Sequence, residues 1–194
     1  GWLIPNTKDI IEAKGGTTTE AIIKGKKYQG AIVRDPVPGI HFHVTVLDFA
    51  SLYPSAIRNW NLSYDTLLCT HEECRGNLVP GTPHWVCTKR WGMTSELIGS
   101  LKDLRVLWYK PRSKDKGLTE GERQYYDVVQ QAMKVFLNAS YGVFGAESFP
   151  LYCPPLAEST AAVGRYALEE ATKKSAHLGI EVLYGDTDSV FLNH

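Results

Sequence analysis

Two short acidic segments, each placed directly after an apolar stretch, constrain this chain more than any other feature. Asp48 follows VTVL, and Asp186 and Asp188 follow IEVLY. β-Branched and aromatic residues favour strands, whereas aspartate favours the turn beyond the end of a strand. Two such strands lying side by side would bring Asp48 and Asp188 together at one edge of a sheet.

Carboxylates held this close raise each other's pKa unless a cation neutralises them. Oxygen ligands favour Mg²⁺, which keeps waters and binds one or two carboxylates together with substrate phosphates. We therefore expect a divalent-metal site at Asp48 and Asp188, of the kind that supports two-metal phosphoryl or nucleotidyl transfer. The alternative for each aspartate taken alone is that it caps a turn.

The composition fits a folded chain of one domain or slightly more. Hydrophobic residues make up 43% of the 194 residues, which is enough for a sizeable core. Lys plus Arg equals Asp plus Glu at 21 each, and a neutral chain is an unusual free-standing nucleic-acid binder. No apolar run approaches the ~18 residues of a membrane span and no signal peptide is recognisable, so we expect an intracellular, cytoplasmic protein without a membrane partner.

The two ends of the sequence predict strands. Ala31–Val33 and His43–Leu47 predict a strand pair, separated by the turn DPVPG, that leads into Asp48. Ile180–Tyr184 and Ser189–Leu192 predict a hairpin around GDTD, preceded by an Ala-rich helix over residues 158–178.

The middle of the sequence predicts two long helices. Apolar residues recur at helical spacing over residues 95–111. Thr119 and Glu122 predict a capping box for a second helix, over about residues 120–141, which Gly142 would close.

Four segments, in this order along the chain, resemble motifs of family B DNA polymerases of the archaeal replicative kind. YQGA at 28–31 resembles Y-x-G-[GA], and DFASLYPS at 48–55 resembles D-x-x-S-L-Y-P-S. KVFLNASYG at 134–142 resembles K-x-x-x-N-[SA]-x-Y-G, and YGDTDS at 184–189 resembles the third, acidic motif. The resemblance covers essentially all 194 residues. It implies an α+β fold: a polymerase palm, which is an antiparallel sheet with packing helices, and fingers made of two antiparallel helices.

Together with the local patterns, the resemblance divides the chain into four parts. Residues 1–65 would form the N-terminal part of the palm, and 66–92 a loop-rich insert that contains cysteines. Residues 93–145 would form the helical fingers, and 146–194 the C-terminal part of the palm with the catalytic hairpin.

The activity that the resemblance implies is DNA-directed DNA polymerisation, the transfer of a nucleotide from dNTP to a primer 3′-hydroxyl. It implies two Mg²⁺ ions per active site, which Mn²⁺ can replace, with primer–template DNA and dNTP as partners. The exonuclease domain, the rest of the palm and the thumb would be further partners in cis or trans, and the chain alone would be poorly active or inactive. The alternative from another class is a non-catalytic palm that serves as a scaffold or subunit.

The resemblance also implies roles for single residues. Asp48 and Asp188 would be metal ligands, Phe49 would add its backbone carbonyl, and Asp186 would be the less firm catalytic carboxylate. A further set would bind the nucleotide and the DNA.

In that set, Tyr53 would lie under the incoming sugar and exclude a 2′-hydroxyl by a steric clash. Backbone N–H groups near Leu52 and Tyr53 would face the triphosphate. Tyr28 and Gly30, from YQGA, would contact DNA.

Lys134, Asn138 and Tyr141 stand at i, i+4 and i+7, so that on a helix they share one face. This face can present a cation to phosphate, an amide near it and an aromatic ring to the nascent base pair; a solvated polar stripe is the alternative. The resemblance aligns Arg105 with a phosphate-gripping arginine, and the fork of a guanidinium suits bidentate contact.

The insert holds Cys69, Cys74 and Cys87 together with His71 and His84. The spacings C-x-H-x₂-C and H-x₂-C are possible but irregular for zinc. The resemblance offers a disulfide between Cys74 and Cys87, as in some archaeal members, and such intracellular bridges occur mainly in hyperthermophiles. Disulfide, reduced thiols and zinc stay open as alternatives.

Overall fold

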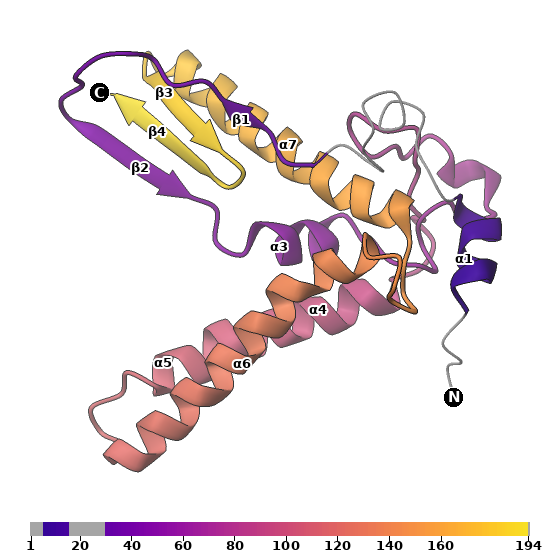
Figure 1. Ribbon diagram of the computed structural model, residues 1–194, viewed down its shortest axis with the longest axis horizontal. Helices are drawn as coiled ribbons and strands as arrows, with labels where there is room; N and C mark the ends of the chain where they lie inside the picture. The colour runs from indigo at the N-terminus through magenta and orange to yellow at the C-terminus, as the bar shows by residue number, and fades with distance from the viewer. Residues whose placement is uncertain (1–5, 16–29, 194) are drawn as a thin grey trace.

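The computed structural model describes residues 6–15 and 30–193, and it combines helices with an antiparallel sheet (Figure 1). The strands are β1 (Val33–Arg34), β2 (Val44–Asp48), β3 (Glu181–Asp186) and β4 (Ser189–Asn193). The helices are α1 (Thr7–Lys14), α3 (Leu52–Asn59), α4 (Met93–Asp103), α5 (Lys110–Arg112), α6 (Glu120–Phe144) and α7 (Pro154–His177), with the 3₁₀ helix η1 (Glu72–Cys74) and the π-helical stretch η2 (Leu104–Tyr109). The predicted α+β class is confirmed at the level of a mixed helical and antiparallel fold.

The sheet has the strand order β1-β3-β4-β2, and all its neighbours are antiparallel. The predicted hairpin is confirmed, because β3 and β4 are joined by a two-residue turn and pair with Asp186 opposite Ser189. β2 pairs with β4 so that Asp48 also lies opposite Ser189. The acidic end of β2 and the acidic turn of the hairpin therefore meet at one place.

The predicted pairing of the strands at 31–33 and 43–47 is wrong. β1 pairs with β3 and β2 pairs with β4, so the hairpin lies between them. The hairpin takes the centre because its residues Val182 and Leu192 pack against Leu168 of α7, whereas β2 is exposed along its whole length. Burial of apolar surface, rather than proximity in the sequence, decides the strand order.

The helices α4 to α6 form an arm that projects from the body, and within the arm α6 runs back beside α4, η2 and α5 (Figure 1).

The predicted capping box at Thr119 and Glu122 is confirmed, since each accepts a hydrogen bond from the other's backbone. The predicted end of this helix at Gly142 is wrong, because α6 continues to Phe144. The ring of Phe144 is buried and packs edge-on against Tyr64 at 5.6 Å, which favours the extra turn.

The short helix α3 is the centre of the molecule, with contacts to α4, α6 and α7. Its residue Ile57 is fully buried, in a core that also includes Leu137 of α6 and Leu156 of α7. Because α3 follows β2 directly, this core fixes the sheet edge relative to the arm. None of the helices among residues 6–15 and 30–193 is both long and apolar enough to cross a membrane.

Candidate active site

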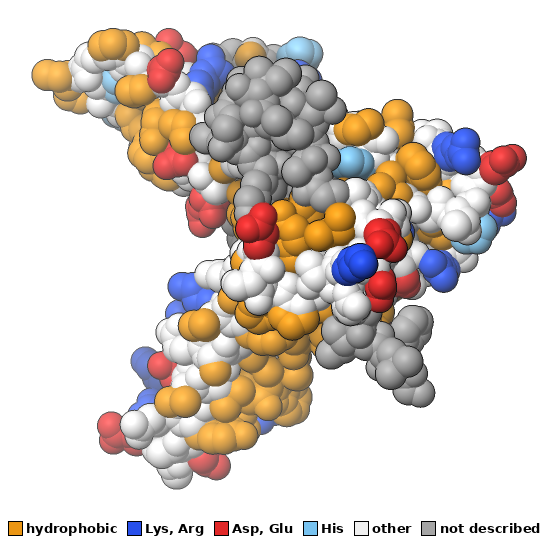
Figure 2. All heavy atoms as spheres, turned by 45° about the vertical axis from the view of Figure 1, so that its right-hand side comes forward, with side chains coloured by type: hydrophobic (Ala, Val, Ile, Leu, Met, Phe, Trp, Pro, Cys, Tyr) orange, Lys and Arg blue, Asp and Glu red, His pale blue; other side chains and the backbone are white. Residues whose placement is uncertain are grey.

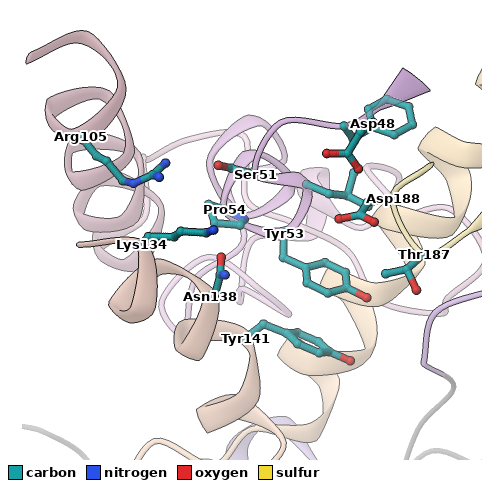
Figure 3. A pocket seen from close by; sticks show the side chains of 12 residues that line it. Asp48, Ser51, Tyr53, Pro54, Arg105, Lys134, Asn138, Tyr141, Thr187 and Asp188 are labelled. Carbon is teal, nitrogen blue, oxygen red and sulfur yellow. The ribbon is translucent and has the colours of Figure 1, made fainter. Parts of the chain in front are cut away.

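A pocket of about 480 Å³ lies between the sheet edge, the start of α3 and the arm (Figure 3). Most of the residues predicted for the site line this pocket, although they come from distant parts of the sequence. They are Asp48, Phe49, Leu52, Tyr53, Arg105, Lys134, Asn138, Tyr141 and Asp188.

On the sheet side, Asp48 ends β2 and Asp188 lies in the hairpin turn, and their carboxylates are neighbours (Figure 3). The N–H of Phe49 donates to the carbonyl oxygen of Asp188 at 2.7 Å, which ties the two segments together. Burial, followed by the negative charge of Asp48, raises the pKa of the Asp188 carboxyl. Within the described part of the chain, neither carboxylate forms an ion pair with a Lys or Arg side chain.

Asp186 points elsewhere. It ends β3, and its carboxylate accepts hydrogen bonds from Thr187 Oγ1 at 2.8 Å and from the Tyr184 hydroxyl at 3.4 Å. It does not line the pocket. The structure therefore separates the two aspartates of GDTD into one that faces the pocket and one that is held by its neighbours.

Tyr53 has two close neighbours. Its ring stacks on Tyr141 of α6 with centroids 4.4 Å apart and an interplanar angle of 26°. A Cβ added to Gly164 of α7 would lie 3.2 Å from the Tyr53 ring, so only glycine leaves this ring its full space. Sequence analysis missed Gly164; the available signal was a glycine inside an Ala-rich helix, where it costs about 1 kcal/mol relative to alanine.

The start of α3 brings backbone N–H groups to the pocket. Ser51 is the N-cap residue of α3 and has φ 54°, in the left-handed region that residues other than glycine rarely adopt. Its side chain does not cap the helix. The first N–H groups of a helix have no acceptor within it, and such a terminus attracts anions. Ser51, Pro54 and Thr187 also line the pocket and were not predicted. Thr187 too has a positive φ, of 52°, and strained residues of this kind gather at functional sites.

On the arm side, α6 presents Lys134, Asn138 and Tyr141 to the pocket on one face, as their spacing predicted (Figure 3). Arg105 lies in η2 and is only 9% exposed. Its Nε donates to the carbonyl oxygen of Gln130 at 3.0 Å, and its Nη2 donates to the Gln130 side-chain oxygen at 3.1 Å. Gln130 was not predicted. Its two hydrogen bonds orient the guanidinium of Arg105, and Arg105 also lines the pocket.

Of the two residues predicted to contact DNA, Gly30 does not line the pocket. Tyr28 lies outside the described residues. The carbonyl oxygen of Gly30 accepts a hydrogen bond of 2.6 Å from Arg165 Nη1 of α7, so this backbone is tied to the helix that covers the sheet.

Cys74 and Cys87, the predicted disulfide pair, are both free thiols in the structure. Instead of pairing, they converge with Cys69 and His71. His84 takes no part in this cluster, because its Nε2 pairs with a Glu158 carboxylate oxygen at 2.7 Å in a buried contact with α7.

Comparison with known proteins shows the family to which the chain belongs. The family model for DNA polymerase family B matches residues 3–194, and the chain belongs to this family. It is 53% identical over 193 residues to DNA polymerase 1 of Aeropyrum pernix, and 50% identical over 194 residues to DNA polymerase 1 of Sulfurisphaera ohwakuensis. These alignments cover 98% of this chain but 20% and 22% of the two relatives.

A solved structure supports the same assignment. The family B DNA polymerase from the hyperthermophilic archaeon Pyrobaculum calidifontis matches with a TM-score of 0.67 and 35% identity, over 87% of this chain and 22% of that chain. The predicted resemblance is thus confirmed. The chain spans about a fifth of the length of the curated relatives it matches.

Proposed function

We propose that this chain is the catalytic segment of a DNA-directed DNA polymerase, which transfers a nucleotide from dNTP to a primer 3′-hydroxyl. The proposal rests on one observation: in this pocket, two carboxylates face cationic and amide side chains, with the Tyr53 and Tyr141 rings between them and the body of the protein. In this proposal, the sheet with α7 is part of the palm and the arm is the fingers.

The donor set at Asp48 and Asp188 fits a divalent metal. The two carboxylates lie together without a Lys or Arg partner among the described residues, and the charge of Asp48 contributes to the raised pKa of Asp188. A bound cation would remove this repulsion, and the carbonyl of Phe49 offers a further hard oxygen. When bound, two Mg²⁺ ions would lower the pKa of the primer hydroxyl and neutralise the triphosphate and the leaving pyrophosphate.

The opposite wall would hold the triphosphate. Lys134 is exposed and forms no ion pair among the described residues, so its ammonium group can meet phosphate. Arg105 is the second cation. Two of its N–H groups donate to Gln130, which orients the guanidinium, and its other N–H groups can donate to phosphate. The N–H groups at the start of α3 add partial positive charge between the two walls.

Tyr53 would form the floor under the sugar. A ring fixed by Tyr141 and by the close approach of Gly164 cannot retreat from an added 2′-hydroxyl, so a ribonucleotide would clash. Asn138 and Tyr141 follow Lys134 on α6 by about one and two turns. Asn138 would lie near the triphosphate, and Tyr141 near the nascent base pair.

The remaining polymerase segments are proposed partners, because large hydrophobic side chains are exposed along one side of the arm (Figure 2). Contiguous apolar surface of this kind marks an interaction site. The large hydrophobic side chains exposed on η2 and α6 of the arm, without regard to side, include Leu104, Leu107, Trp108, Val128 and Phe136. β2 is also an edge strand, which another strand can pair with.

The test uses a chimaeric polymerase. Residues 1–194 replace the matching segment of DNA polymerase 1 of Aeropyrum pernix, and we refer to this chimaera as the completed polymerase. We expect metal-dependent primer extension that disappears in Asp188→Ala and persists in Asp9→Ala, which changes an exposed aspartate of α1. A completed polymerase that folds and binds DNA but does not extend primers would favour the scaffold alternative.

A further inference from the structure

A second cluster of chemically active side chains lies away from the pocket, in the segment 66–92. The ligand atoms of Cys69, His71, Cys74 and Cys87 all lie within 4.8 Å of one another. The Sγ of Cys87 is 3.4 Å from Nδ1 of His71, and the three thiols are buried. The fourth cysteine of the chain, Cys153, is buried as well but does not belong to this cluster.

The geometry points to a structural zinc site, and we propose that these four residues bind Zn²⁺ in a Cys₃His tetrahedron. With Zn–S bonds of about 2.3 Å and Zn–N bonds of about 2.0–2.1 Å, the ligand atoms of such a tetrahedron lie about 3.5–3.8 Å apart. In the cluster, Cys87 Sγ and His71 Nδ1 are 3.4 Å apart and no two ligand atoms are more than 4.8 Å apart, so a contraction of the widest separation by about 1 Å suffices. Three thiolates and one imidazole are soft ligands that favour zinc over the Mg²⁺ expected at the carboxylates.

The backbone around the cluster supports thiolates. The N–H of Thr88 donates to Cys74 Sγ, and the N–H of Lys89 donates to Cys87 Sγ, each at 3.4 Å. Hydrogen bonds from outside the ligand set stabilise the charged form of metal ligands and fix their orientation. A disulfide would use only two of the three converging sulfurs and would leave His71 without a role.

The segment has little regular secondary structure, although Leu67, Val79 and Val86 are buried in the main core. Its secondary structure consists of η1 and two isolated bridges, Leu67 with Val86 and Leu78 with Trp85. Small loop-rich units of this kind usually need a disulfide or a metal for stability. Since all four positions of the tetrahedron come from the chain, the site would be closed and structural rather than catalytic.

The site would also brace the frame of the pocket. Asn61, just beyond α3, donates through Nδ2 to the carbonyl oxygen of Cys87 at 3.2 Å and accepts from the N–H of Gly92 at 2.7 Å. Gly92 is the N-cap of α4, which leads to Arg105. Zinc at Cys87 would thus fix the connection between the helix that carries Tyr53 and the helix that leads into the arm.

The experiment measures metal rather than activity, so it stands apart from the proposed polymerase function. The completed polymerase is purified without added metal, and its zinc content is compared with that of Cys87→Ser and of the control Cys153→Ser. We expect about one zinc per chain more in the parent and in Cys153→Ser than in Cys87→Ser. Replacement of zinc by Co²⁺ should give the intense visible absorption of a tetrahedral thiolate site in the same two proteins.

Thiol counting covers the case in which Cys87→Ser does not fold. In the parent, three thiols should become reactive only after a zinc-selective chelator is added, and Zn²⁺ should protect them again. A parent that contains no zinc and whose cluster thiols react without chelator would overturn the proposal. A mass that shows a bridge between Cys74 and Cys87 in the native protein would overturn it as well.

Discussion

The pocket and the cysteine cluster are both ligand sets, but the chain builds them in opposite ways. The pocket gathers Asp48 and Asp188 from positions 140 residues apart in the sequence, whereas the cluster lies within the short span from Cys69 to Cys87. The pocket carboxylates are hard oxygens on a sheet edge, beside open space that a substrate can enter. The cluster ligands are soft, mostly buried and closed. An open oxygen site suits chemistry on a substrate, whereas a closed sulfur site suits stability.

This contrast predicts that the largest loss of activity comes from the carboxylates and leaves zinc untouched. In the completed polymerase, Asp48→Ala should lower primer extension by at least ~10³-fold, because the ion that neutralises developing charge loses a ligand. Zinc content should stay at the parent value. Single-turnover extension and metal analysis of the same preparation measure both. A parallel loss of zinc would mean that the two sites are not independent.

The next largest effect concerns the chain without its proposed partners. The 194-residue chain alone should extend primers at least ~10²-fold more slowly than the completed polymerase, because small misplacement of reacting groups is costly in rate. Its zinc content should nevertheless match that of the completed polymerase, since all four proposed ligands lie within the chain. Extension by the purified monomer at the full rate would show that no further segment is needed.

The cluster should affect stability more than chemistry. Removal of zinc from the completed polymerase should lower the Tm by several degrees, on the scale of ~2–5 kcal/mol for the loss of a structural cross-link. Primer extension at a temperature well below the Tm should fall by less than about tenfold, because no cluster residue lines the pocket. Readdition of Zn²⁺ should restore the Tm. Loss of extension at low temperature with an unchanged Tm would assign the cluster to catalysis instead.

A smaller effect should follow at the aromatic floor. Tyr53→Ala should raise ribonucleotide incorporation relative to deoxyribonucleotide by about 10–100-fold, because the clash with the 2′-hydroxyl is removed. Gly164→Ala should shift the ratio in the same direction by less, since its Cβ would displace the ring without deleting it. Single-nucleotide kinetics with matched dNTP and rNTP measure the ratio. Unchanged discrimination in Tyr53→Ala would exclude the tyrosine from sugar selection.

The sequence could predict the pocket better than the cluster for a physical reason. Strand ends and helical spacing are local, so Asp48, Asp188 and the face that starts at Lys134 could be placed before the fold was known. The strand order could not, because it depends on the burial of the hairpin against α7. Likewise, the sequence predicted that Gly142 would end α6, whereas the packing of Phe144 extends the helix to that residue. The cysteine spacings left disulfide, reduced thiols and zinc open as alternatives, because only the fold brings all three sulfurs together with His71.

The smallest predicted effect is a pH dependence at the pocket. A carboxyl whose pKa is higher in the folded than in the unfolded chain binds more protons when folded, so its charge lowers stability at high pH. The raised pKa of Asp188 therefore predicts that Asp188→Asn stabilises the metal-free pocket at neutral pH, by less than ~1 kcal/mol because the group is partly exposed. This gain in stability should shrink as the pH falls through the raised pKa toward the ordinary value of 3.8.

Thermal unfolding of the parent and of Asp188→Asn in Mg²⁺-free buffer, with zinc retained, gives the difference in stability at each pH. Mg²⁺ should reverse the sign of this difference, because it stabilises the parent alone. A destabilisation by Asp188→Asn that is the same at every pH would show that the side chain acts through packing or hydrogen bonding rather than through its charge.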